Sequence, residues 1–435
     1  MEGTLDTILY PEREAWPRLM QRGITDTSAV RETVAAVLAD VRRRGDQALL
    51  EYEERFDGVT LTSLRVSEAE MAEAESLVGE PLKEALAVAA ANIRRFHEAQ
   101  RMQPISVVTT GGVTCSQRAV PIQKVGLYVP GGTAPLFSTV LMLAIPAKIA
   151  GCRQIVLCTP PDRQGKIHPA ILYAARMAGV TEIYKIGGSQ AIAAMAYGTE
   201  TVPRVYKIFG PGNRFVMEAK QQASVQNVAI DMPAGPSEVM IIADGEANPT
   251  FVAADFLSQA EHGADSQSIL LTTDRTLAEK VADETERLLT ALPRRDLIRR
   301  SLSHSRIIVL ANEDEMMDFA NEYAPEHLII NHKEADRLAK RVENAGSVFL
   351  GAYACESAGD YASGTNHTLP TSGYAHAYSG VNLDSFMKKI TFQTLSEEGI
   401  ANLGPVIETL AENEELLAHK LAATVRINAI KEKKL

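Results

Sequence analysis

The sequence predicts an α/β protein with two Rossmann-like parallel-sheet domains. From about residue 115 onward, short β-branched runs alternate with helical stretches, which is the pattern of βαβ units. Ten such runs are too many for one comfortable open sheet, so we expect two domains. The segment from Pro233 to Pro236 breaks both periodicities and is a plausible crossing between them.

The expected elements follow in order along the chain. Residues 28–57 and 68–101 have the periodicity of long amphipathic helices. Strands are expected at residues 125–129, 154–158, 182–186, 205–208, 228–231, 239–242, 268–272, 306–310, 328–330 and 347–350. Residues 351–380 are rich in Gly, Ser, Thr, Tyr and Asn, and we expect a long functional loop there. Residues 405–431 are again expected to be helical.

Composition excludes several classes of protein. The chain has 435 residues, of which 46% are hydrophobic and 23% charged, an ordinary globular balance. A net charge of -11 argues against a nucleic-acid or anionic-membrane partner. The longest apolar run, residues 139–150, is too short to span a bilayer, and no signal peptide is visible. We therefore expect a cytoplasmic protein.

We do not expect the cysteines and most of the isolated histidines to take part in catalysis or metal binding. None of the cysteines forms a Cys-x-x-Cys pair, so a disulfide framework or a Cys-based zinc ribbon is not expected. Cys115 and Cys152 are conceivable acyl-transfer nucleophiles, although a buried small hydrophobe is the better interpretation of Cys152. The sequence does not decide the place of His376. We expect four other histidines at the surface: His97, His168, His304 and His332.

Gln259 and His262 are the first candidates for a metal site. They are three residues apart at the end of an apolar helical run, so a helix would place both on one face. An amide oxygen and an imidazole nitrogen suit a borderline cation such as zinc. Asp360, between glycines in the long loop, is a further candidate ligand, although alone it would more simply cap a turn. His419 is similar, and alone would be a surface histidine.

Glu326 and His327 are the candidates for proton transfer. They follow Pro325 and precede the strand at 328–330. Adjacent residues on a strand face opposite ways, so both can serve one pocket only at the strand's start, where the proline allows a turn. An imidazole suits the transfer of an alcohol proton, and a neighbouring carboxylate could activate water. A surface-exposed polar pair is the alternative.

Three glycine turns indicate a dinucleotide site without the usual Gly-x-Gly-x-x-Gly fingerprint. Each turn follows a strand and precedes a helix, at Gly131–Gly132, Gly187–Gly188 and Gly210–Gly212. In a parallel sheet such turns meet at the carboxyl edge, where helix N-termini favour phosphate. Tyr128, Gln190 and Asn213 lie at these turns and could bind NAD in an atypical pose, or the glycines could simply form tight turns.

The segments that carry these residues are similar to those of the histidinol dehydrogenases. The resemblance covers nearly the whole chain and includes residues 126–137, 187–190, 210–213, 231–239, 259–262, 325–328 and 359–367. It implies oxidation of L-histidinol via L-histidinaldehyde to L-histidine with two NAD, the last two steps of histidine biosynthesis. It also implies an aldehyde-dehydrogenase-like fold, the histidinol dehydrogenase fold.

The resemblance assigns roles to individual residues. Zinc, one per subunit, would be bound by Gln259, His262, Asp360 and His419, with His419 supplied by the partner subunit of a homodimer. Zinc would act mainly as a template for the substrate's nitrogens. Glu326 and His327 would be the acid/base pair. The amino alcohol would also be contacted by Ser237, His367 and Glu414. NAD would be held by Tyr128, Gln190 and Asn213.

The family's fold also implies domain limits. Residues 130–236 would form an NAD-binding domain inserted into a larger α/β domain made of residues 1–129 and 237–380. Residues 381–435 would be helical dimerisation elements.

Three rival functions remain on the sequence alone. A related zinc/NAD dehydrogenase could act on another polar alcohol such as a sulfonated diol, but Glu414 favours a cationic amine. A thiol-dependent aldehyde dehydrogenase would use Cys115 or Cys152. A metal-binding dimer with purely structural zinc would be expected to have a closed, Cys-rich ligand set, which this chain lacks.

Overall fold

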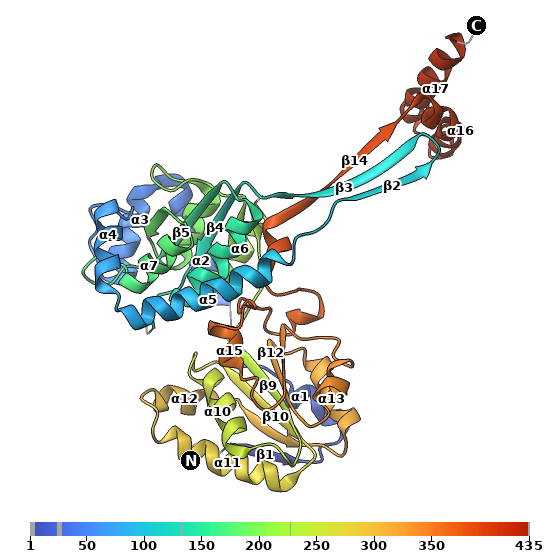
Figure 1. The fold of residues 1–435 in the computed structure, drawn as a ribbon. Coiled ribbons are helices and arrows are strands. Elements are labelled where there is room, and N and C mark those ends of the chain that lie inside the picture. The colour runs from blue at the N-terminus through green and yellow to red at the C-terminus, as the bar shows by residue number, and fades with distance from the viewer. Residues whose placement is uncertain (1–4, 24–27, 132–133, 227, 434–435) are drawn as a thin grey trace. The chain divides into compact units, whose positions relative to one another are not determined.

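A computed structural model describes residues 5–23, 28–131, 134–226 and 228–433 (Figure 1). Gly132, in the first predicted glycine turn, lies outside the described residues. The contacts divide the chain into two compact units. The first comprises Met1–Ala99 and Ile122–Phe386, and the second comprises Gln100–Pro121 and Met387–Leu435.

A six-stranded parallel sheet in the first unit holds the predicted acid/base pair. Its strand order is β1-β11-β10-β9-β12-β13, with β9 (Glu238–Ala243) and β12 (His327–Asn331) side by side and His327 opposite Val239. Every residue of β9 is buried, because helices cover both faces of the sheet. Val239 and Ile241 pack on the side of α10 and α11, whereas Met240 and Ile242 pack on the side of α1 and α13. The other strands are β1 (Asp6–Leu9), β10 (Gln267–Thr272), β11 (Arg306–Val309) and β13 (Ser347–Leu350).

A five-stranded parallel sheet forms the second layered core of the same unit. Its order is β6-β5-β4-β7-β8, with β4 (Lys124–Tyr128), β5 (Gln154–Thr159), β6 (Glu182–Lys185), β7 (Lys207–Phe209) and β8 (Ala229–Ile230). The N-terminal helices pack on its helices: α2 on α8 and α9, α4 on α7, and α5 on α6. The ten strands expected from the sequence are thus all present, in two parallel sheets, and the predicted α/β class is confirmed.

Side-chain caps fix the starts of several helices. Asn248 accepts a hydrogen bond from the backbone N–H of Thr250 at the start of α10, and Ser67 and Glu70 form a capping box on α4. The helices of the first unit are α1 (Trp16–Leu19), α2 (Ser28–Arg44), α3 (Asp46–Tyr52), α4 (Glu68–Leu77), α5 (Glu80–Glu98), α6 (Phe137–Ala150), α7 (Pro169–Met177), α8 (Gly188–Tyr197), α9 (Arg214–Ser224), α10 (Pro249–Ala260), α11 (Arg275–Leu289), α12 (Arg295–Leu302), α13 (Glu313–Tyr323), α14 (Ala335–Ala339) and α15 (Glu356–Tyr361). A π-helical turn, η2 (Glu53–Asp57), follows α3.

The second unit is an antiparallel sheet with two helices. The strand order is β14-β3-β2, from β2 (Ile105–Thr110), β3 (Val113–Pro121) and β14 (Met387–Leu395), and the helices are α16 (Glu397–Asn413) and α17 (Leu417–Glu432). The predicted C-terminal helical segment is therefore present. The three strands were not predicted, because β2 and β14 are exposed on both faces and lack a buried, apolar pattern.

Some expectations about single residues were wrong. Asp360 lies within the helix α15 rather than in a free loop. Gly359 serves packing there, because a Cβ at this position would lie 2.7 Å from the ring of Phe349. His97 and His332 were expected at the surface but are buried. His97 is held by a 2.8 Å contact between its Nδ1 and the Ile93 carbonyl oxygen.

The predicted domain limits stay a prediction. The segment 233–236 does connect β8 of one sheet to β9 of the other. However, β4 begins before residue 130 and already belongs to the five-stranded sheet. Among the described residues, no helix combines the length and the apolar character needed to cross a membrane.

Candidate active site

Gln259 lies at the amino edge of the six-stranded sheet, on the last turn of α10. Because α10 runs back from the carboxyl end of β9, its C-terminus returns to the edge where β9 and β12 begin. The helix ends at Ala260, so His262 lies just beyond it, tied by a 3.2 Å hydrogen bond from its backbone N–H to the Gln259 carbonyl. Gln259 is buried and His262 is exposed. The predicted pair is thus split between a helix end and the turn that follows.

The orientation of the Gln259 amide is set by Glu326. Gln259 Nε2 donates to Glu326 Oε2 at 3.2 Å, and the same oxygen accepts the backbone N–H of Glu238 at 2.8 Å. Gln259 Oε1 is left facing away from this carboxylate, buried and without a hydrogen-bond partner in the described part of the chain. Burial raises the pKa of Glu326 to about 8, against the opposing charge of His327.

His327 is oriented in the same way. Its Nδ1 lies 3.2 Å from the Glu238 carbonyl oxygen, which fixes Nδ1 as the donor, while Nε2 lies 3.4 Å from Asp360 Oδ1. Nδ1 is also 3.6 Å from Glu326 Oε2, so the two neighbours in sequence do face one pocket. Burial lowers the pKa of His327, but the carboxylates of Glu326, Glu356 and Asp360 raise it more, to about 10.

Glycine and proline explain how Glu326 and His327 can converge. Ala324 ends α13 in the left-handed region (φ 51°), and Pro325 then turns the chain into β12. A Cβ on Gly346 would lie 2.5 Å from the Glu326 carbonyl oxygen, so only glycine allows the neighbouring segment to approach. The turn expected from Pro325 is therefore present.

His367 links the segment of Asp360 to the helix α6. Its Nδ1 lies 2.8 Å from the Asp360 carbonyl oxygen, and its Nε2 lies 3.1 Å from the Thr139 hydroxyl. Asn366 adds a hydrogen bond from its Nδ2 to the Met142 carbonyl at 2.6 Å. Both ring nitrogens of His367 are thus engaged within the chain.

The unpartnered atoms of this site fit a divalent cation. Gln259 Oε1 is buried without a hydrogen-bond partner among the described residues, and the buried Asp360 Oδ1 has only the 3.4 Å ion pair with His327 Nε2. One ligand atom each from His262, Glu356 and Asp360 lie within 4.8 Å of one another. Buried polar atoms without partners are costly, and amide, imidazole and carboxylate donors are those that zinc accepts. The carboxylates of Glu326, Glu356 and Asp360 around the buried His327 ring also favour a positive charge in this pocket.

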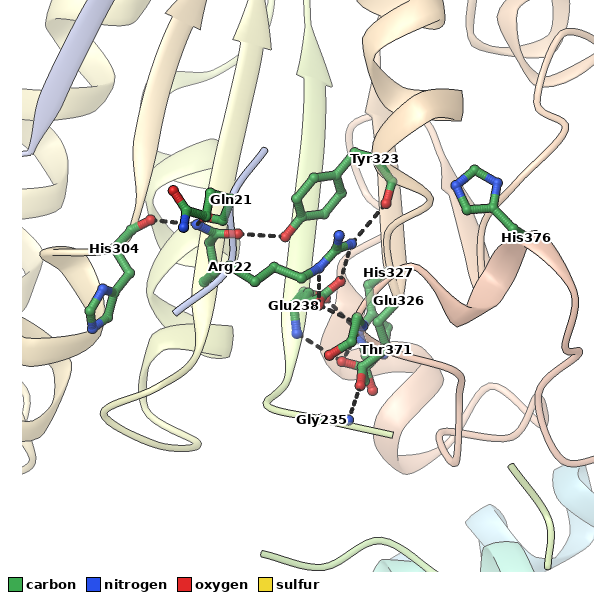
Figure 2. A network of polar contacts seen from close by, with 12 residues as sticks. Gln21, Arg22, Gly235, Glu238, His304, Tyr323, Glu326, His327, Thr371 and His376 are labelled. Atoms are coloured by element: carbon green, nitrogen blue, oxygen red, sulfur yellow. Dashed lines mark hydrogen bonds and ion pairs between the residues drawn. The ribbon is translucent and has the colours of Figure 1, made fainter. Parts of the chain in front are cut away.

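The ion pair of Arg22 with Glu238 lies next to the acid/base pair of Glu326 and His327 (Figure 2). Arg22 donates to both carboxylate oxygens of Glu238, from Nε at 2.6 Å and from Nη2 at 3.0 Å, and its Nη2 also donates to the Tyr323 carbonyl. The guanidinium lies 3.9 Å above the Tyr323 ring. Because the backbone of Glu238 contacts both Glu326 and His327, this ion pair fixes the position of both.

The glycine turns of the five-stranded sheet line a cavity of about 1140 Å³ at its carboxyl edge. Tyr128, Gly188, Gln190 and Asn213 are among the lining residues, with parts of α2, α4 and η2. The Tyr128 hydroxyl accepts the backbone N–H of Gly188 at 3.0 Å, and Asn213 Oδ1 caps α9 by accepting the N–H groups of two residues. The cavity is large enough for a dinucleotide.

Glu53 occupies the second glycine turn. Its Oε1 accepts the backbone N–H of Gly187 at 3.1 Å and Gln190 Nε2 at 3.0 Å. Glu53 is buried, and desolvation followed by the charge of Asp57 raises its pKa to about 8. The N–H groups of Gly187 and Gly188 are therefore already bound by side chains, which differs from an open phosphate-binding turn.

The other predicted residues are distributed over both units. Ser237 directly precedes β9, is half-buried, and its carbonyl accepts the Gln267 N–H at 3.1 Å. Glu414 and His419 belong to the second unit, where Glu414 follows α16 and His419 lies in the first turn of α17. Both are exposed.

Cys152 offers no activated thiol. Cys152 is buried and burial raises the pKa of its thiol to about 12, so little thiolate exists at neutral pH. Cys115 lies on β3 of the second unit. The burial of Cys152 argues against a thiol-dependent dehydrogenase that uses this residue.

Sequence reasoning missed Glu356, Glu53 and the Arg22–Glu238 pair. Glu356 could have been found, because it stands four residues before Asp360, the spacing of one helical face. The others had no local signal, since Arg22 and Glu238 are 216 residues apart in sequence.

Known proteins resemble this chain along almost its whole length. The sequence model of the family described as histidinol dehydrogenase matches residues 20–427. A histidinol dehydrogenase of Bacteroides thetaiotaomicron is 59% identical over 424 residues, covering 98% of this chain and 99% of its own. One of Escherichia coli K12 is 53% identical and covers 95% of both chains. The crystal structure of histidinol dehydrogenase from Elizabethkingia anophelis superposes with a TM-score of 0.97 at 52% identity, covering 99% of this chain and 100% of its own. The chain therefore belongs to the histidinol dehydrogenase family.

Proposed function

We propose that this protein is a zinc- and NAD-dependent histidinol dehydrogenase, which oxidises L-histidinol via L-histidinaldehyde to L-histidine. Beyond the family, one observation supports this function most. The buried Gln259 Oε1, which has no hydrogen bond among the described residues, and the buried ion pair of Asp360 Oδ1 with His327 Nε2 lie beside the carboxylate of Glu326. This arrangement combines a cation site with an acid/base pair.

Zinc would be held by Gln259 Oε1, His262 and Asp360, with His419 of a second copy completing the set. When bound, zinc supplies a Lewis-acid template for the substrate's nitrogens, and NAD supplies the hydride acceptor. Glu326 contributes by keeping the Gln259 amide turned so that its oxygen, not its nitrogen, faces the cation.

His327 and Glu326 would divide the proton transfers. His327 Nε2 faces Asp360 Oδ1 at 3.4 Å, whereas Nδ1 is held by the Glu238 carbonyl. A cation on Asp360 would weaken the attraction that raises the pKa of His327, and the neutral ring could then take the alcohol proton at Nε2 in the first oxidation. Glu326, whose pKa burial raises to about 8, would in its ionised form remove a proton from water in the second oxidation. Ser237, His367 and Glu414 would contact the amino alcohol, with the Glu414 carboxylate facing its ammonium group.

The cavity at the five-stranded sheet is the proposed NAD site. Gln190 and Tyr128 are both held in place, by Glu53 and Gly188 respectively, and Asn213 lies at the N-terminus of α9. The hydrogen bonds of His367 and Asn366 to α6 connect the Asp360 segment to the layer that carries this cavity.

A homodimer with shared sites is proposed from the second unit. It exposes many large apolar side chains, which monomers rarely leave uncovered: Val107, Val108, Ile390, Phe392, Leu395, Val406, Leu410, Leu416, Leu417, Leu421 and Val425. A second copy is the occupant that would also deliver His419 and Glu414 to the site.

Subunit mixing tests whether the sites are shared. His419→Asn and Glu326→Gln should each be almost inactive alone in the complete conversion of L-histidinol to L-histidine, which is the activity measured here. In a heterodimer of the two, one site would combine a wild-type Glu326 with the wild-type His419 of its partner. Random mixing should therefore restore about a quarter of wild-type activity. No recovery from mixtures in which heterodimers are demonstrated would place His419 outside the partner's site.

The function itself is tested by following NADH formation with L-histidinol, before and after removal of zinc by a chelator and after its return. Two NADH per L-histidinol, lost on chelation and restored by zinc, is the expected result. No NADH from the zinc-loaded dimer would rule out histidinol as substrate and direct the search to other amino or sulfonated alcohols.

A further inference from the structure

Lys220 and Asp231 form a buried ion pair that the mechanism above does not use. Lys220 lies on α9 and Asp231 directly follows β8, and the two side chains are each 1% exposed. Lys220 Nζ lies 2.5 Å from Asp231 Oδ1. A buried ion pair adds little net stability compared with apolar residues of the same size, so folding alone does not account for it.

Both members of the pair bind the backbone of Gly210, the first residue of the third glycine turn. Asp231 Oδ2 accepts the Gly210 N–H at 2.8 Å, and Lys220 Nζ donates to the Gly210 carbonyl oxygen at 2.8 Å. Both peptide groups that flank the Gly210 Cα are therefore fixed by buried side chains. Gly210 has a φ of 125°, which glycine adopts without the steric cost that other residues meet.

The turn held in this way affects two of the proposed NAD-binding residues. Asn213 ends the turn, caps α9 and lines the cavity at the carboxyl edge. Gly210 packs against the backbone of Tyr128, which lines the same cavity, because a Cβ on Gly210 would overlap the Tyr128 carbonyl oxygen. A shift of the turn would therefore move Asn213 and disturb the wall that Tyr128 forms.

We propose that Lys220 and Asp231 are positioning residues for NAD, which hold the third glycine turn where Asn213 and Tyr128 can bind the cofactor. The inference rests on the proposed NAD site and extends it. Both side chains are buried, so they act through the turn and not by touching the cofactor. Because the pair is neutral overall, it fixes the turn without adding net negative charge beside a cofactor that carries phosphates.

Lys220→Met tests this, because methionine keeps much of the apolar stem but removes the charge and the donor to Gly210. Binding of NADH to the zinc-loaded protein is followed by fluorescence, and the KM for NAD and kcat are measured with L-histidinol. We expect the Kd for NADH and the KM for NAD to rise at least about tenfold. The kcat at saturating NAD should stay within about threefold of the wild type, as expected for a loss of cofactor binding alone.

The double variant that combines Lys220→Met with Asp231→Asn separates positioning from folding. It leaves no charge buried, and asparagine can still accept the Gly210 N–H, so it should be more stable than Lys220→Met. The Gly210 carbonyl still lacks its donor, so NADH should bind at least about fivefold more weakly than to the wild type.

Ile308→Ala is the control for lost stability. Ile308 is fully buried on β11 of the six-stranded sheet, away from the turns of the five-stranded sheet. Its truncation should cost about 2–5 kcal/mol of stability. We expect the affinity of the folded variant for NADH to be unchanged.

Two results would overturn the proposal. One is a Kd for NADH within about threefold of the wild type in Lys220→Met or, should that variant not fold, in the double variant. The other is an equal rise of the Kd in Ile308→Ala, which would make the effect a consequence of lost stability. Turnover of L-histidinol separates this inference from the proposed function. If the wild type binds NADH more tightly than the Lys220 variants but forms no NADH from L-histidinol, only the proposed function fails.

Discussion

Replacing Arg22 by methionine should destabilise the protein through Glu238. Methionine keeps an apolar stem that can still lie over the Tyr323 ring, but it removes both donors to the Glu238 carboxylate. The Glu238 side chain is 3% exposed, so water cannot replace them. Only the Ser372 N–H would remain on that carboxylate, at 2.7 Å.

The magnitude follows from the burial of the pair. Removing one partner of a buried ion pair costs about 3–5 kcal/mol, and because the Arg22 side chain is 25% exposed, we expect about 3 kcal/mol. Burial already raises the pKa of Glu238, and loss of Arg22 would raise it further. A carboxyl pKa raised in the folded state means that stability falls as pH rises, so the deficit should be smaller near about pH 5 than near about pH 8.

Urea unfolding at both pH values measures the deficit. Arg13→Met is the control, because Arg13 pairs with Asp318 at the surface, where the side chains are 66% and 47% exposed, and should cost less than about 1 kcal/mol. Adding Glu238→Gln to Arg22→Met should recover much of the loss. If Arg22→Met is no less stable than Arg13→Met at either pH, the pair does not support the site as argued.

The remaining predictions concern Glu53, Glu326 and Asn213. The pKa of Glu53 is raised to about 8, so this residue disfavours the folded state increasingly as the pH rises towards that value. Thermal melts should show that Glu53→Gln is stabilised by about 1–3 kcal/mol at alkaline pH and is little changed below about pH 4.5. A variant that gains no stability at alkaline pH would contradict this. Glu326→Gln should slow oxidation of L-histidinaldehyde by about 10²–10⁴-fold and oxidation of L-histidinol less, measured with each substrate separately; equal losses would refute the division of roles. Asn213→Ala should raise the KM for NAD and lower the stability by about 1 kcal/mol, because it removes the N-cap of α9. Asn213→Ser keeps a capping side chain and should change only the KM for NAD. If the KM is unchanged in both variants, Asn213 does not belong to the NAD site.

Ten strands of the two parallel sheets could be predicted because most of them are buried on both faces, whereas β1, which is largely exposed, was not predicted. β9, with the sequence Glu-Val-Met-Ile-Ile-Ala, is a continuous buried run, and its apolar side chains alternate between two helix layers. The sheet of β2, β3 and β14 was not predicted, because strands that are exposed on both faces show no alternation of apolar and polar residues. If a second copy covers this unit, its apolar side chains become buried only in the dimer.

The candidate site was predictable only where its residues are close in sequence. Gln259 and His262 are three residues apart, and Glu326 and His327 are adjacent. These short spacings allowed a metal-binding pair and an acid/base pair to be predicted from the sequence. The groups that orient them come from distant segments: Glu238 holds Glu326 across 88 residues of sequence. Burial of such carboxylates depends on tertiary contacts, which no local pattern encodes.

A crystal structure of the zinc-loaded dimer with L-histidinol, recorded at the zinc absorption edge, would test the central claim most directly. We predict one anomalous peak per subunit at about 2.0–2.2 Å from Gln259 Oε1, from a His262 ring nitrogen and from an Asp360 oxygen, with the substrate's alcohol carbon facing His327. A peak elsewhere, or full occupancy by substrate with no metal between these residues, would contradict the account.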